Sequence, residues 1–234
     1  MVLYGTRPEA IKLCPLILAL RRQPWVQLQV VSSGQHRDMP RSVLRYFGVT
    51  PDVDLGLMQR GQTPAAFTQR LMAALMPLLT DATTAPDVCL VHGDTTTAFV
   101  GALCCFYAGI PVVHVEAGLR TYDGRAPYPE EFNRQAVSII SKYNFAPTEV
   151  SRQNLLKEGK KSADIYVTGN TAIDALKTTV REDYTHPELE WAKDSRLIMI
   201  TAHRRENLGE PMHNMFRAIR RVLEEHADVK AIYP

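Results

Sequence analysis

The sequence predicts an α/β fold with a mostly parallel sheet, because short apolar segments alternate with helical segments along most of the chain. The short segments have the length of buried strands, and the longer ones carry apolar residues at helical spacing. Helices that connect parallel strands cover both faces of such a sheet. Strands are expected at residues 1–4, 28–32, 88–92, 112–115, 144–146, 165–168, 197–201 and 229–233.

Helices are expected between these strands, at residues 8–21, 63–80, 95–108, 150–158, 172–180 and 212–225. Thr6 and Glu9 fit a capping box at the start of the first helix, and Pro8 suits its first turn. Pro77 is expected to break the second helix near its end. The last helix has an apolar stripe at helical spacing, which predicts packing in a core. The stripe consists of Met212, Met215, Phe216, Ile219, Val222 and Leu223.

We expect a complete N-terminal domain at residues 1–168, a hinge at 169–195 and the start of a second domain at 196–234. The hinge begins with Gly169-Asn170-Thr171 and continues into a polar segment that contains proline. Only one helix and two strands are expected after it, which is too few to bury a core. The sequence therefore predicts a C-terminally truncated version of a two-domain protein.

Composition and charge argue against several classes of protein. Hydrophobic residues make up 45% of the 234 residues and charged residues 22%, which is typical of a soluble globular protein. The net charge of +2 and the dispersed basic residues predict no nucleic-acid partner. Gly109 and Pro111 divide the uncharged segment 98–113 into a helix and a strand, so no membrane association is expected.

The cysteines predict a reducing compartment and no metal site. Cys14, Cys89, Cys104 and Cys105 lie in apolar segments, without a Cys-x-x-Cys pair or a histidine at metal-ligand spacing. Thiols in such positions are usually buried and reduced. No secretory signal is recognisable at the start of the sequence. Together these features predict a cytoplasmic location.

Three carboxylates follow the expected strands closely. Glu116 comes directly after a strand, Asp94 follows a strand by two positions, and Glu130 lies in the succeeding loop. Ligands of doubly wound sheets bind beyond the carboxyl ends of the strands, where crowded carboxylates have raised pKa values and exchange protons near neutral pH. For a single acid, a helix cap or a solvated charge is the alternative, and Asp94 before Thr95 fits a cap.

A strand followed by Gly5-Thr6-Arg7-Pro8 at the start of a helix predicts an anion site. Helix N-termini favour anions, and Arg7 and Lys12 add positive charge there. The alternative is a tight turn with solvated charges. Among the three acids are further arginines that can bind phosphate through two nitrogens. They are Arg120, Arg125 and Arg134.

Five segments together resemble the bacterial non-hydrolysing UDP-N-acetylglucosamine 2-epimerases. They are GTRPEAIK at 5–12, HGDTTT at 92–97, HVEAGLR at 114–120, PEEFNR at 129–134 and TAHRREN at 201–207. The resemblance implies two Rossmann-like doubly wound domains in a GT-B-like architecture, with the second incomplete here. Members of that family continue further and contain an Asp-Ser-Gly-Gly segment with paired glutamates that binds the nucleotide. The segment Gly124-Arg125-Ala126 departs from the family pattern.

The resemblance implies reversible epimerisation at C2 of UDP-N-acetylglucosamine to UDP-N-acetylmannosamine, by elimination and re-addition of UDP, for cell-surface polysaccharide synthesis. It implies Asp94, Glu116 and Glu130 as the acid/base set and leaves open which one removes the proton. His203 is implied to stabilise the departing diphosphate. No cofactor is implied, and the sequence lacks a Gly-x-Gly-x-x-Gly pattern.

The resemblance also implies binding residues and a homodimer. The residues implied to bind UDP are Arg7, Lys12, Arg134, Arg204 and Arg205. Three further residues resemble a second UDP-N-acetylglucosamine site used for activation, with a polar helix start as the alternative. They are Gln35, His36 and Arg70.

Several alternatives stay open from the sequence. A metallophosphoesterase is one alternative, because its Gly-Asp, Gly-Asn and His motifs resemble Gly93-Asp94, Gly169-Asn170 and His203. Those enzymes, however, need Asp-x-His after the first strand to hold metals. A glycosyltransferase would share the two-domain architecture without needing three acids. A hydrolysing 2-epimerase and a non-catalytic nucleotide-sugar-binding fragment are the remaining alternatives. We expect the 234-residue form to be inactive alone.

Overall fold

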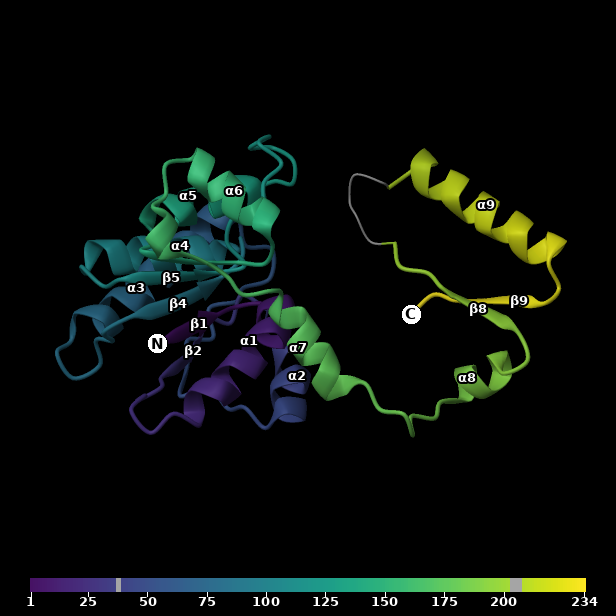
Figure 1. Cartoon of the computed structure of the whole chain (residues 1–234), viewed down its shortest axis with the longest axis horizontal. Helices are drawn as coiled ribbons and strands as arrows, with labels where there is room; N and C mark the ends of the chain where they lie inside the picture. Colours follow the sequence, from purple (N-terminus) through teal and green to yellow (C-terminus); the bar gives the residue numbers. More distant parts are fainter. Residues whose placement is uncertain (37–38, 203–207) are drawn as a thin grey trace. The chain divides into compact units, whose positions relative to one another are not determined.

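The computed structural model describes residues 1–36, 39–202 and 208–234. The chain divides into two compact units, Met1–Thr179 and Val180–Pro234 (Figure 1). The first unit holds every predicted site residue except His203, Arg204 and Arg205. Those three lie outside the described residues.

Within the described part of the first unit, seven strands form one sheet in the order β3-β2-β1-β4-β5-β6-β7. Each pairing in this sheet is parallel. The order of connection reverses between β1 and β4, which is where doubly wound sheets bind ligands. The strands are β1 Val2–Tyr4, β2 Val30–Ser32, β3 Val53–Asp54, β4 Cys89–His92, β5 Val112–Val115, β6 Tyr143–Ala146 and β7 Ile165–Val167.

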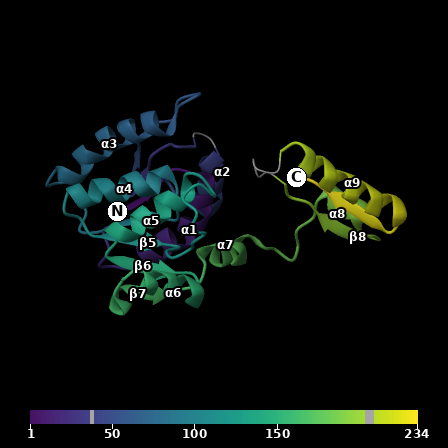
Figure 2. The ribbon, with the colours of Figure 1, turned by 90° about the horizontal axis from the view of Figure 1, so that it is seen from above.

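Helices cover both faces of this sheet, as Figures 1 and 2 show. The helices are α1 Arg7–Arg21, α2 Met39–Phe47, α3 Pro64–Thr80, α4 Thr96–Tyr107, α5 Glu130–Ile140, α6 Glu149–Lys157 and α7 Thr171–Thr179, with a 3₁₀ turn at Ser162–Asp164. Successive strand residues alternate between two cores, as the pleat of a strand requires. Leu3 packs with α3, α4 and α5, whereas Val2 and Tyr4 pack with α1, α2 and α7. The predicted α/β fold is therefore confirmed.

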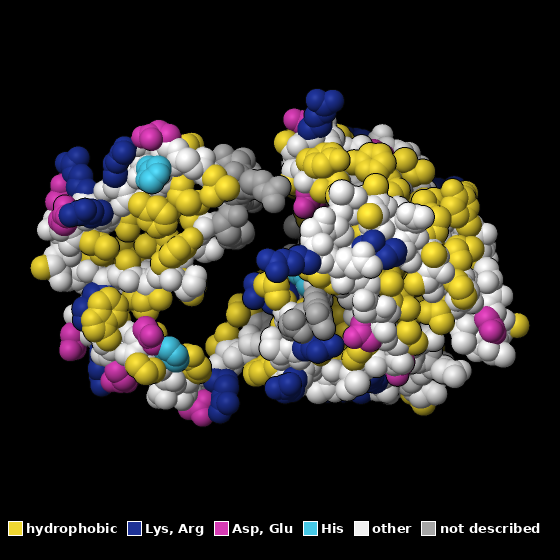
Figure 3. Space-filling view, turned by 180° about the vertical axis from the view of Figure 1, so that it is seen from behind, with side chains coloured by type: hydrophobic (Ala, Val, Ile, Leu, Met, Phe, Trp, Pro, Cys, Tyr) yellow, Lys and Arg dark blue, Asp and Glu magenta, His cyan; other side chains and the backbone are white. Residues whose placement is uncertain are grey.

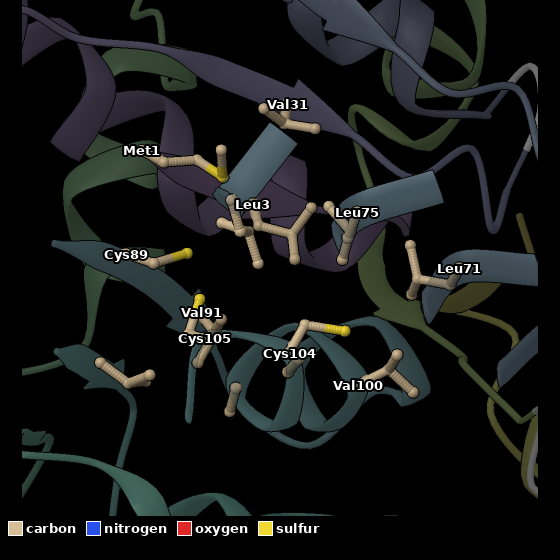
Figure 4. Close-up of a cluster of buried hydrophobic side chains, with 14 of the residues drawn as sticks. Met1, Leu3, Val31, Leu71, Leu75, Cys89, Val91, Val100, Cys104 and Cys105 are labelled. Carbon is tan, nitrogen blue, oxygen red and sulfur yellow. The ribbon is translucent and has the colours of Figure 1, made fainter. Parts of the chain in front are cut away.

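The core beneath α3 and α4 contains most of the thiols (Figure 4). Cys89 comes from β4, and Cys104 and Cys105 come from α4. Cys14 lies in the core on the other face. All four cysteines are free and buried, which confirms the prediction of buried, reduced thiols.

Two helical predictions differ from the structure. The expected break at Pro77 is wrong, because α3 continues to Thr80 and buries Leu79 beside Leu71 and Leu75. That burial offsets the hydrogen bond that proline cannot donate. The segment after Pro129, expected to be a loop, forms α5.

The first compact unit extends into the segment 169–195 that was expected to be a hinge, because it includes α7. Helix α7 packs against α1 and buries Ala175 in the core of α1 and α2. Among the described residues, no helix has the length and apolar character needed to cross a membrane.

The second unit contains α8 Pro187–Ala192, β8 Arg196–Met199, α9 Glu210–Glu225 and β9 Val229–Ile232. Strand β8 pairs in parallel with β9. The apolar stripe of α9 was expected in a core, but none of its residues is fully buried. Phe216 remains 36% exposed and Val222 40% exposed, since two strands cover only part of the helix. Figure 3 shows the hydrophobic side chains that this unit leaves exposed.

Candidate active site

The candidate site lies at the carboxyl ends of β1, β4 and β5, around the point where the strand order reverses. Gly5 and Thr6 follow β1, Asp94 follows β4, and Glu116 follows β5. Strand β4 pairs with both β1 and β5, so the three loops are neighbours. Glu130 begins α5 and thus lies on a helix rather than in a loop.

The three predicted carboxylates influence one another. Burial raises the pKa of Asp94 above its usual value, Arg134 opposes this effect, and the charges of Glu130 and Glu116 add to it. Oε2 of Glu130 is buried without a hydrogen-bond partner in the described chain. Thr95, and not Asp94, caps α4 by accepting a hydrogen bond from the N–H of Ala98. Asp94 is therefore free of the capping role that the sequence left open.

Arg134 lies between two carboxylates. Its Nη2 is 3.3 Å from Oδ2 of Asp94, and its Nε is 3.2 Å from Oε2 of Glu131. The amide of Asn133 donates to the backbone oxygen of Asp94, so α5 holds the loop after β4 from two adjacent positions. Arg134 thus places positive charge directly beside Asp94.

Glu116 occupies an unusual backbone conformation and contacts a cation. Its φ of 64° lies in the left-handed region, which costs a non-glycine residue about 1–3 kcal/mol and is typical of functional sites. Its Oε2 is 2.5 Å from Nζ of Lys12 and 3.8 Å from Nε2 of His92. A Cβ on Gly93, which has a φ of +63°, would lie 3.9 Å from Oε1 of Glu116. Lys12 was expected to bind phosphate, but in this structure it forms an ion pair with Glu116.

The N-terminus of α1 already holds an internal carboxylate. The N–H groups of Gly5 and Thr6 donate to Oε2 of Glu9 at 3.0 and 2.8 Å, and the hydroxyl oxygen of Thr6 accepts from the N–H of Glu9 in return. This arrangement confirms the predicted capping box. The N–H of Arg7 donates to Nδ1 of His36 at 3.4 Å. The backbone donors predicted to bind an anion are therefore occupied, which leaves the exposed side chain of Arg7 for that role.

Two of the three predicted regulatory residues contact helix starts, Gln35 that of α4 and His36 that of α1. Oε1 of Gln35 accepts hydrogen bonds from Oγ1 and N of Thr97, at 2.7 and 3.2 Å. The N–H of His36 donates to the backbone oxygen of Gly5. Arg70 on α3 instead donates to Gln62, and within the described residues no hydrogen bond joins it to Gln35 or His36.

Arg120 does not join the carboxylates, contrary to the sequence-based expectation. Its buried guanidinium binds both oxygens of Glu158 at 2.7 Å and also donates to Oγ of Ser138. The side chain of Arg120 therefore connects the loop after β5 with the end of α6. Arg125 lies in an exposed part of that loop.

The buried acid of α5 that sequence reasoning missed is Glu131. Its two oxygens accept hydrogen bonds from the N–H groups of Thr121 and Tyr122, and Gln135 donates to it as well. Burial alone would raise the pKa of Glu131, but these hydrogen bonds outweigh burial and lower the pKa. Glu131 thus shapes the loop, while its neighbour Glu130 keeps an unpaired oxygen. Residues 1–36, 39–202 and 208–234 contain no cluster of side chains arranged to hold a metal ion.

Comparisons with known proteins identify the family of the chain. The model of the UDP-N-acetylglucosamine 2-epimerase family matches residues 18–234. The UDP-N-acetylglucosamine 2-epimerase of Bacillus subtilis is 52% identical over 234 residues, which is 100% of this chain and 61% of the relative. The enzyme of that name from Escherichia coli K12 is 43% identical over 243 residues, covering 100% of this chain and 64% of the relative.

A crystal structure of UDP-GlcNAc 2-epimerase from Neisseria meningitidis bound to UDP-GlcNAc superposes with a TM-score of 0.91 at 40% identity. The match covers 100% of this chain and 64% of that one. This chain therefore spans less than two thirds of the length of these relatives. The family match extends over both compact units, and the relatives align with the whole chain. The chain belongs to the UDP-N-acetylglucosamine 2-epimerase family.

Proposed function

We propose that the protein interconverts UDP-N-acetylglucosamine and UDP-N-acetylmannosamine by reversible epimerisation at C2, without net hydrolysis. The observation that carries the proposal is the group of Asp94, Glu116 and Glu130 at the reversal point of the sheet, with cations beside two of them. Relatives at 43–52% identity carry the name of this enzyme, and the Neisseria structure contains UDP-GlcNAc.

The chemistry needs two carboxyl groups in different states. The C2 proton of the sugar is not acidic until UDP departs with the electron pair of the C1–O bond. One carboxylate then takes the proton, a C1=C2 bond forms, and a protonated acid on the opposite face returns a proton to C2 while UDP adds again at C1. We assign Glu116, which contacts Lys12, as the base, and the raised pKa of Asp94 suits a proton donor.

Cations support the departure of the diphosphate in this proposal. The residues assigned to bind UDP are Arg7, Lys12, Arg134, His203, Arg204 and Arg205, of which the last three lie outside the described residues. Positive charge near a leaving diphosphate stabilises the charge that grows in the transition state. Gln35 and His36, with Arg70, are assigned to a second UDP-N-acetylglucosamine site that activates the enzyme.

The cellular setting is also part of the proposal. Buried free thiols support a cytoplasmic location, where the product would feed cell-surface polysaccharide synthesis. Large apolar side chains on the adjoining helices α4 and α5 support a homodimer, since Phe106, Tyr107 and Ile139 are 61%, 64% and 80% exposed.

Deuterium incorporation from solvent tests the reaction. The complete protein, incubated with UDP-N-acetylglucosamine in deuterated water, should place deuterium at C2 of both recovered sugar nucleotides, because the abstracted proton exchanges with solvent. Mass spectrometry and NMR measure the label. Epimerisation with full retention of the original hydrogen contradicts elimination, and release of free N-acetylmannosamine with UDP would indicate a hydrolysing enzyme instead.

A further inference from the structure

His92 presents an unused polar atom beside Glu116. His92 is the last residue of β4 and is only 3% exposed, and its Nε2 is buried without a hydrogen-bond partner in the described chain. This nitrogen lies 3.8 Å from Oε2 of Glu116, beyond the range of about 2.7–3.2 Å for an N–H···O hydrogen bond. A buried polar atom without a partner is unfavourable, so Nε2 of His92 is a candidate for a hydrogen bond to a nearby group.

The ring of His92 is neutral near pH 7. Burial, and after it the positive charge of Lys12, lowers the pKa of His92 to about 3. A neutral imidazole donates one hydrogen bond and accepts another. Beside a carboxylate oxygen, the favourable tautomer carries its proton on Nε2.

Glu116 is faced by charged or titratable groups from three elements. Lys12 comes from α1 and contacts Oε2 of Glu116, while His92 and then Asp94 come from β4 and the loop after it. His114 lies on β5, two positions before Glu116, and its Nε2 is 2.7 Å from the backbone oxygen of Gly93. Of the groups within contact distance of Glu116 in the described chain, Lys12 is more exposed than His92, so an anionic ligand reaches Lys12 first.

We propose that His92 is a positioning residue for Glu116, whose carboxylate accepts a hydrogen bond from Nε2–H of His92 in the reacting complex. A shift of about 0.6 Å, from 3.8 to 3.2 Å, brings the two atoms into hydrogen-bonding range. This uncharged donor, fixed at the end of a strand, holds Glu116 when Lys12 turns toward the diphosphate. No proton is transferred to or from His92. The inference rests on the proposed epimerase function, with Glu116 as the base.

Two matched substitutions of His92 separate a positioning role from a structural one. The amide of His92→Gln reaches the position of Nε2, whereas the shorter amide of His92→Asn does not. His92→Asn in the complete protein should lower kcat by about 10-fold to 100-fold, the loss expected for one hydrogen bond to a charged group, with KM within about threefold. His92→Gln should stay within about fivefold of the unmodified protein.

The pH profile gives the readout that a structural role would not move. The acidic limb of kcat, which reports the substrate complex, should shift to higher pH in His92→Asn, because Glu116 has lost its donor in that complex, and should stay in place in His92→Gln. His114→Asn is the control, since it removes the contact with Gly93 and should lower the Tm without moving this limb.

Three results would overturn the proposal: equal kcat losses in His92→Gln and His92→Asn, an unmoved acidic limb in His92→Asn, or additive effects with Glu116→Gln. In the Glu116→Gln background, His92→Asn should reduce the residual deuterium exchange at C2 by less than about threefold, because the two residues act as one unit. Absence of exchange at C2 in the unmodified protein would contradict the epimerase function itself, so the two failures are distinguishable.

Discussion

Replacing Gly118 with alanine should destabilise the loop that carries Glu116. Gly118 has a φ of +88°, and a Cβ there would lie 2.2 Å from the backbone oxygen of Ser151 and 2.8 Å from its carbon. Both atoms belong to the backbone of α6, so they cannot rotate away as a side chain would. The backbone oxygen of Gly118 also accepts a hydrogen bond of 3.0 Å from the amide of Asn154. The loop and α6 must therefore separate to admit a methyl group.

The expected cost has two parts. A left-handed conformation costs a non-glycine residue about 1–2 kcal/mol, and an overpacked methyl group adds about 1–3 kcal/mol. The sum is roughly 2–5 kcal/mol, which corresponds to a fall in Tm of roughly 4–20 °C for a domain of this size. Gly109→Ala is the matched control, because Gly109 has a φ of +72° and a Cβ added there would meet nothing within 4 Å. In that variant only the cost of the left-handed conformation applies, so the Tm should fall by roughly 2–8 °C.

Thermal unfolding followed by near-ultraviolet circular dichroism measures both variants in the complete protein. Gly118→Ala should unfold at the lower temperature of the two, and its turnover should fall even below its Tm, because Glu116 lies two positions earlier in the same loop. A loss of stability in Gly109→Ala that equals or exceeds that of Gly118→Ala would refute the close-approach argument.

Two further predictions concern stability. Arg120→Ala should lower the free energy of unfolding by roughly 1–3 kcal/mol, because it leaves Glu158 without its bidentate partner. The control Arg125→Ala, at an exposed position, should change this free energy by less than about 0.5 kcal/mol. Urea titration measures both variants, and equal losses would contradict a stabilising role of the Arg120–Glu158 pair. Burial lowers the pKa of His92 and His114 from 6.5 to about 3, so the unfolded chain binds more protons and stability should fall as pH drops from 6.5 toward 3. A urea midpoint that is no lower at pH 5 than at pH 7.5 would contradict this linkage.

The parts of the fold that could be predicted have local causes. Strands β1, β4 and β5 are short apolar runs, and each ends at a residue that leads into a charged loop. The capping box of Thr6 and Glu9 depends on residues three positions apart, so sequence spacing is enough to predict it. Because parallel strands end at the same edge of a sheet, these local signals also place Asp94 and Glu116 near each other.

Helix α5 could not be predicted because its buried face is mostly polar. Glu131, Asn133 and Ser138 are buried there beside Val137, whereas the large apolar Phe132 and Ile139 are 55% and 80% exposed, so the apolar residues do not mark the buried face. Their partners are backbone groups of the preceding loops and neighbouring side chains, such as the N–H of Thr121 for Glu131. A helix that is anchored by hydrogen bonds to loops is recognisable only when those loops are already in place.

The pairing of charges at the site is determined by packing and not by spacing. Lys12 and Glu116 pair although they are separated by 104 positions. Arg120 pairs with Glu158, 38 positions later in the sequence. At the carboxyl edge of a parallel sheet, a long cationic side chain has several acceptors within reach, and the direction of its backbone decides among them. Glu116 points toward Lys12 because its left-handed φ turns the chain at the end of β5. The sequence can therefore list the charged groups of such a site, whereas their partners follow from the backbone geometry.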